Sequence, residues 1–151
     1  MEMSDKLGHI FSEALSEVVA TVSGVQLQEK SHDNDNSYDD MTGIMVLKGK
    51  ENGILSVSAK ISVARELCSK IIGISAAEVT DDDIADTMCE LVNMTAGSAK
   101  LRLSDTDYFF TLTQPFVIKG NDVSIITKNI TNILASTLSN DDISIKLKAI
   151  Y

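Results

Sequence analysis

The fold is decided by residues 80–103, TDDDIADTMCELVNMTAGSAKLRL, which predict the longest helix of the chain. Thr80 and Asp83 have the spacing of a capping box, and the acidic run after the cap favours the positive end of a helix dipole. At about 100° per residue, six residues fall on one side of this helix and form a stripe that we expect to be buried: Ile84, Met88, Leu91, Val92, Thr95 and Ala99. We therefore predict an amphipathic helix over about 81–103 that packs on a core.

The opposite face of this helix is polar. It collects Asp82, Asp86, Cys89, Glu90, Asn93, Gly97 and Lys100 between about 140° and 240°. Glu90 and Asn93 are neighbours one turn apart, and they point to solvent or to a partner. Gly97 costs about 1 kcal/mol relative to Ala inside a helix, and close approach of another backbone or a partner loop is one reason to keep it. An ordinary exposed helix face shows the same spacing, so the spacing alone does not identify a functional site.

The rest of the chain alternates between helical and strand-like patterns. Apolar residues at three- and four-residue steps predict a helix over 5–23 that Gly24 ends, and a short helix over 63–72 that Ser62 caps and Gly73 ends. Alternating residues around Asn52-Gly53 predict a hairpin over 41–60, whereas residues 31–40 read as a polar loop. Further strands are predicted at 108–113, 123–127, 132–138 and 143–149.

This order of elements predicts an α+β, two-layer fold, with a mostly antiparallel sheet and long helices on one face. A length of 151 residues fits one domain, 1–151. The balance of 13 basic against 22 acidic side chains gives a net charge of −9, which argues against nucleic-acid and membrane-surface binding. The chain has no bilayer-length apolar run and no signal peptide at its start, so we expect a cytoplasmic protein.

Several stretches carry a resemblance to a known family. The run ELVNMTAGSAK at 90–100 resembles the signature helix of the CheC/CheX/FliY phosphatases, which has Glu and Asn three apart followed by Met, Gly, Ala and Lys. Residues 11–25 and 113–120 resemble the first helix of CheX and the Pro-containing stretch after its signature helix. CheC usually repeats the Glu/Asn pair in both halves, but here Glu13 is followed by Ser16. The resemblance is therefore to a CheX-like chemotaxis phosphatase in one domain.

The resemblance implies a phosphatase that removes the aspartyl phosphate of a CheY-like response-regulator receiver. Asn93 would orient the attacking water, and Glu90 would dock on the receiver's active-site lysine. Asp86, Gly97 and Lys100 would lie at the contact with the receiver. The receiver would supply Mg²⁺, so this chain would bind no cofactor or metal of its own, and it would form a homodimer.

Other interpretations stay open at this point. The domain could be a non-catalytic receiver-binding or dimeric adaptor module, and Glu90 could act as a general base instead of a docking group. Lys100 could contact phosphate or simply be solvated. Cys89 is a candidate nucleophile, but His9 and His32 lie in poorly placed segments. Both cysteines are more simply read as inert thiols, and no His/Cys cluster has zinc-ligand spacing.

Overall fold

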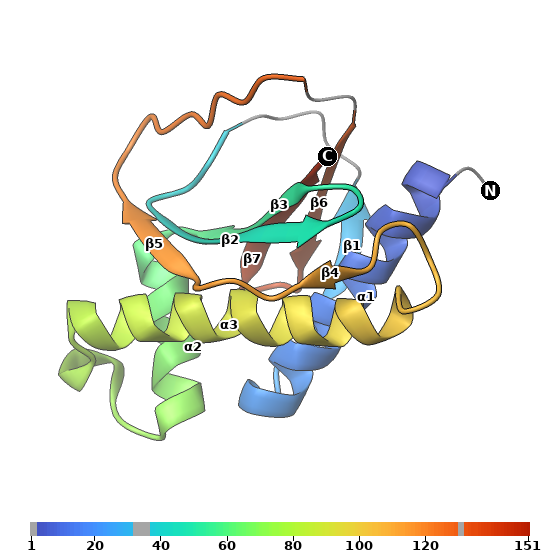
Figure 1. The fold of residues 1–151 in the computed structure, drawn as a ribbon. Helices are drawn as coiled ribbons and strands as arrows, with labels where there is room; N and C mark the ends of the chain where they lie inside the picture. The colour runs from blue at the N-terminus through green and yellow to red at the C-terminus, as the bar shows by residue number, and fades with distance from the viewer. Residues whose placement is uncertain (1–2, 32–36, 130–131) are drawn as a thin grey trace.

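The computed structural model describes residues 3–31, 37–129 and 132–151, so five residues of the predicted polar loop (32–36) lie outside the described part. In that part three α-helices lie against one side of a sheet (Figure 1). The helices are α1 (Met3–Ser23), α2 (Ile61–Ile72) and α3 (Asp81–Arg102), with a 3₁₀ turn, η1, at Ala76–Glu78. The predicted α+β architecture with helices on one face is confirmed. No described helix is long and apolar enough to cross a membrane.

The sheet is antiparallel at every pairing that the described residues make. Its strand order is β1-β6-β7-β3-β2-β4, and β5 also pairs with β2. The strands are β1 (Gln28–Ser31), β2 (Met41–Gly49), β3 (Gly53–Ala59), β4 (Phe110–Thr111), β5 (Phe116–Lys119), β6 (Ile133–Ser139) and β7 (Ser144–Ile150). The outer edge of β2 is thus shared by β5 at one end and β4 at the other.

Helix α3 begins as the sequence predicts. The Thr80 hydroxyl accepts a hydrogen bond from the Asp83 N–H at 3.1 Å, and the Asp83 carboxylate accepts one from the Thr80 N–H at 3.0 Å. All six members of the predicted apolar stripe are buried. At the other end of α3, Arg102 pairs with Glu13 of α1 at 2.8 Å and with Glu17 at 2.6 Å. The cap and the stripe therefore fix which face of α3 is left open.

Helix α3 lies directly on β2 at Gly43. A Cβ atom added at Gly43 would lie 2.5 Å from the Met88 carbonyl oxygen and 3.4 Å from a Val92 methyl group. A separation of 2.5 Å is far inside van der Waals contact, so no side chain fits between strand and helix at this point. Gly43 therefore sets the height of α3 above the sheet.

One strand prediction and one cap prediction are wrong, and two strands, β1 and β5, were not predicted. Residues 123–127 are not a strand; they lie in the connection from β5 to β6, with Ile126 90% exposed. Their alternation of half-buried and exposed residues is real, but strand pairing requires a partner, and β5 and β4 already occupy that edge of β2. Strand β1, in polar sequence, was not predicted. Ser62 lies inside α2, and the Ile61 N–H donates instead to the Asp40 carboxylate at 3.2 Å.

A Gly43→Ala substitution should destabilise the fold by about 1–3 kcal/mol, because the added methyl group must displace α3 or bend β2. Urea unfolding followed by circular dichroism measures this change. The matched control is Gly8→Ala in α1, where the added Cβ meets only Leu134 Cβ at 3.9 Å and helix propensity improves. Equal stability of Gly43→Ala and the unsubstituted protein would show that α3 is not held in this close contact.

Candidate functional site

The outward face of α3 carries the predicted pair. Glu90 is exposed and Asn93 half-buried, and α3 is helical without interruption from Asp81 to Arg102. Neither side chain makes a hydrogen bond or ion pair with the described part of the chain. The carboxylate and the carboxamide therefore lie one turn apart on a rigid element, with their polar atoms available to another molecule.

A shallow hollow of about 640 Å³ lies beside this pair. Its first wall is α3, with Asp86, Cys89, Glu90 and Asn93, and its second is the segment 112–115, which links β4 to β5. Figure 1 shows this linker running along α3. The Thr113 hydroxyl donates to the Val46 carbonyl oxygen at 2.6 Å, so the second wall is anchored to β2.

The second wall adds side chains that the sequence did not place at the site. Leu112, Thr113, Gln114 and Pro115 reach the hollow because β4 and β5 both pair with β2 and leave these four residues to bridge the gap. The exposed Gln114 brings a second carboxamide to the edge of the hollow. The only signal for this in the sequence is the polar Thr-Gln-Pro run between two apolar strands.

The three predicted contact residues have different surroundings. Asp86 is exposed and lines the hollow. A Cβ added at Gly97 would meet nothing within 4 Å, so no described part of the chain explains this glycine and its surface stays open. The Lys100 ammonium lies 5.2 Å from the ring centre of Phe109, in cation–π range, so Lys100 is held beside β4 rather than fully solvated.

Cys89 is a poor nucleophile in this environment. Burial raises the pKa of its thiol, and the negative charges of Asp86 and Glu90 raise it further. A raised pKa keeps the thiol protonated at neutral pH, and only the thiolate is a good nucleophile. His9 pairs with Glu13 on α1 at 3.0 Å, and His32 lies outside the described residues. No group of metal-ligating side chains occurs among the residues that were described.

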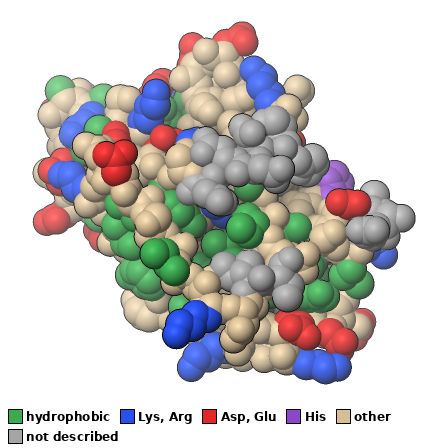
Figure 2. All heavy atoms as spheres, turned by 90° about the horizontal axis from the view of Figure 1, so that it is seen from above, with side chains coloured by type: hydrophobic (Ala, Val, Ile, Leu, Met, Phe, Trp, Pro, Cys, Tyr) green, Lys and Arg blue, Asp and Glu red, His purple; other side chains and the backbone are tan. Residues whose placement is uncertain are grey.

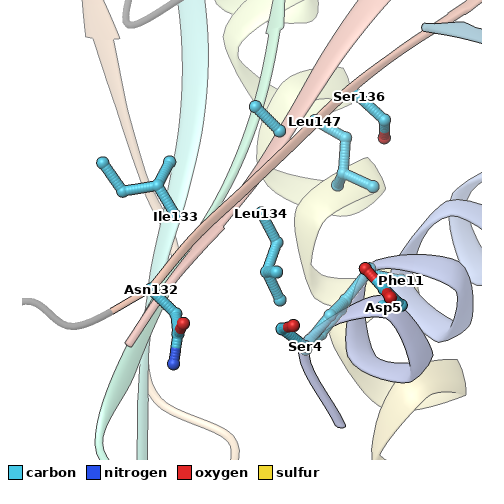
Figure 3. Close-up of a pocket in the computed structure, with 10 residues that line it drawn as sticks. Ser4, Asp5, Phe11, Asn132, Ile133, Leu134, Ser136 and Leu147 are labelled. Atoms are coloured by element: carbon cyan, nitrogen blue, oxygen red, sulfur yellow. The ribbon is translucent and has the colours of Figure 1, made fainter. Parts of the chain in front are cut away.

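Another hollow, of about 220 Å³, lies between the start of α1 and β6. Figure 3 shows Ser4, Asp5 and Phe11 of α1 on one side of it and Asn132 to Leu134 on the other. Its described acidic lining residue is Asp5, and the hydroxyl of the lining residue Ser136 forms a 2.8 Å hydrogen bond with the Ser12 hydroxyl. Among the described residues that line this hollow, no basic side chain or second carboxylate lies beside Asp5, so its chemistry is less suited to catalysis than that beside α3.

The fold and the exposed carboxylate–carboxamide helix define a CheC/CheX-like domain. A family model described as chemotaxis phosphatase CheX matches residues 41–139, and the chain belongs to this family. No curated protein matches the chain.

Solved structures agree on the fold across nearly the whole chain. A chemotaxis protein CheX from Desulfovibrio desulfuricans matches with a TM-score of 0.81 at 22% identity, covering 95% of this chain and 97% of that one. CheX from Vibrio vulnificus matches with 0.83 at 19% identity, covering 99% and 98%. A CheX–CheY–BeF₃–Mg²⁺ complex from Borrelia burgdorferi matches with 0.80 at 23% identity, covering 94% of each chain.

Iodoacetamide should alkylate Cys89 slowly at pH 7.5 in the folded protein, because its raised pKa leaves little thiolate. The rate should still be climbing above pH 9. Mass spectrometry of the Cys89 peptide over a pH series measures it, with the urea-unfolded protein as the unperturbed reference. A folded-state rate that levels off near neutral pH would contradict the assignment and reopen Cys89 as a nucleophile.

Proposed function

We propose that this protein hydrolyses the aspartyl phosphate of a CheY-like receiver, with Asn93 and Glu90 as its working residues. The observation that carries the proposal is that the two side chains share one outward turn of α3, unpaired within the described chain, beside a hollow open to solvent. Membership of the chemotaxis phosphatase CheX family supports the reaction class. The Borrelia burgdorferi complex, in which a CheX is joined to CheY, BeF₃ and Mg²⁺, supports the kind of partner.

The chemistry suits a carboxamide. When an acyl phosphate is hydrolysed at phosphorus, the leaving group is a carboxylate, which needs no general acid. What the hydrolysis still requires is a water molecule held in line with the phosphorus. The Asn93 side chain can accept a hydrogen bond from that water through its carbonyl oxygen and donate one to a phosphoryl oxygen through its NH₂ group. The receiver contributes the aspartate and Mg²⁺. This chain contributes a rigidly placed amide.

Glu90 is assigned to docking. A carboxylate without an ion-pair partner on its own chain is available to the receiver's active-site lysine, and such a charge-assisted bond strengthens when the interface excludes water. Asp86, Gly97 and Lys100 surround the pair on the same face and form the rest of the contact in this proposal. The competing role for Glu90, as a general base, is weaker because carboxylates are weak bases at neutral pH.

The second candidate is a receiver-binding or dimeric adaptor without catalysis. Apolar side chains gather on the side of the molecule away from the helices (Figure 2), which favours association of two copies. We propose that the phosphatase also forms such a homodimer, with α3 left open. Release of inorganic phosphate from an Mg²⁺-loaded phospho-receiver separates the two candidates, since an adaptor alone gives no acceleration.

Asn93→Ala should slow phosphate release by roughly 10² or more, the scale for losing one preorganised group, while receiver binding survives. Single-turnover hydrolysis of a phospho-receiver gives the rate, and titration with a beryllofluoride-loaded receiver gives the affinity. Asn121→Ala, an exposed asparagine outside α3, is the matched control. Hydrolysis by Asn93→Ala at the unsubstituted rate would remove Asn93 from the mechanism.

Glu90→Ala should weaken receiver binding and lower the rate together, because the docking charge is lost. The same two assays apply, and Glu66→Ala removes an equal charge from the exposed side of α2 as a control. A loss of rate at unchanged affinity would instead assign Glu90 as a general base.

A further inference from the structure

An apolar groove lies on the other side of Glu90 from the hollow. It has a volume of about 270 Å³ and lies between α3 and the C-terminal ends of α1 and α2. In Figure 1 those two ends lie together below α3. Its apolar lining comes from all three helices: Val22, Ile71, Ile72, Leu91 and Met94.

The groove leaves apolar surface open beside the site. Leu91 forms its floor and is only 1% exposed, whereas Ile72, the last residue of α2, is 47% exposed. Covering this apolar surface with a partner's apolar side chain is favourable, because both surfaces are removed from water. The groove can therefore take up one large apolar side chain of a partner.

The rim of the groove is acidic. Asp83, Asp86 and Glu90 line it, and none of its other described lining residues is basic. Within the described chain, Asp86 and Glu90 have no ion-pair partner. The C-terminal ends of α1 and α2 add partial negative charge, and α1 has no basic residue in its last turn. Lys70 lies in the last turn of α2, but outside the lining.

The groove is also continuous with the site. Glu90 and Asp86 border both the groove and the hollow that contains Asn93. A partner whose lysine meets Glu90 therefore covers the mouth of the groove as well.

We propose that this groove is the specificity-determining part of the receiver contact. It binds a surface segment of the phosphorylated receiver in which a large apolar side chain stands next to a lysine or arginine. The proposal rests on the proposed function for the identity of the partner. A second copy of this chain is a poor occupant, because its net charge of −9 would meet an acidic rim, and an anionic membrane is disfavoured for the same reason.

The apolar contact is tested by Ile72→Ser, which removes the exposed side chain without touching Glu90 or Asn93. The probe is each CheY-type receiver of the same genome, loaded with BeF₃⁻ and Mg²⁺ for binding, or phosphorylated for turnover. The Kd and KM should rise roughly tenfold. The maximal rate should stay within twofold of that of the unsubstituted protein. Ile72→Leu, which keeps a large apolar side chain, should bind with the unsubstituted affinity. Ile133→Ser is the matched control, since Ile133 is 44% exposed on β6 and outside the groove.

The charge preference is tested at the same position with Ile72→Lys and Ile72→Glu. Both remove the apolar contact, so any difference between them reports the charge of the segment that the groove binds. Ile72→Lys should bind several times more weakly than Ile72→Glu at low ionic strength, and the gap should close at 1 M salt, where charges are screened beyond about 3 Å. The reverse order would overturn the basic partner.

The remaining outcomes separate this inference from the proposed function. If the unsubstituted chain hydrolyses the phospho-receiver and Asn93→Ala does not, but Ile72→Ser binds normally, the groove proposal alone fails. If Ile72→Ser changes only the oligomeric state in light scattering, the occupant is a second copy and the proposal is overturned. If no receiver binds or is hydrolysed, the proposed function fails and takes this inference with it.

Discussion

The contact between Gly43 and the backbone of Met88 is the constraint on which the site depends. A helix that packs on a sheet through side chains can rotate and shift as those side chains adjust, but a helix carbonyl group against a glycine leaves no room for adjustment. With α3 fixed in height, its buried stripe can meet the core in one orientation. The outward direction of Glu90 and Asn93 follows from that orientation, since they lie only two and five residues after Met88 on the same helix.

The second wall of the site follows from the same packing. Strands β5 and β4 pair with opposite ends of β2, the strand that carries Gly43. Residues 112–115 connect these two strands and therefore run along α3, whose height above the sheet is set by Gly43. The hydrogen bond from Thr113 to Val46 holds them in this position. Both walls of the hollow, α3 and the 112–115 linker, are thus held by β2, which fixes their positions relative to each other.

The electrostatics around Glu90 act on both the thiol and the proposed partner. Asp86 and Glu90 help to raise the pKa of Cys89, which keeps this thiol out of the chemistry. The same charges, unpaired within the described chain, give the exposed face of α3 an acidic character that suits a receiver's catalytic lysine. In the proposed reaction this chain supplies position through a neutral amide on an acidic face, the receiver supplies the metal and the phosphorylated aspartate, and water is the phosphoryl acceptor.

Features that arise from local interactions could be predicted before folding was considered: the Thr80 capping box, the buried stripe of α3, the Asn52-Gly53 hairpin and the outward placement of Glu90 and Asn93. Which segments pair at the sheet edge depends on packing. An alternating sequence pattern indicates burial on one side, but it does not show whether a neighbouring strand has an unpaired edge. So β5 formed at 116–119 and 123–127 stayed a connection. The hollow, the apolar groove and the Asp40 bond to α2 likewise join segments far apart in the chain, and their geometry exists only after packing.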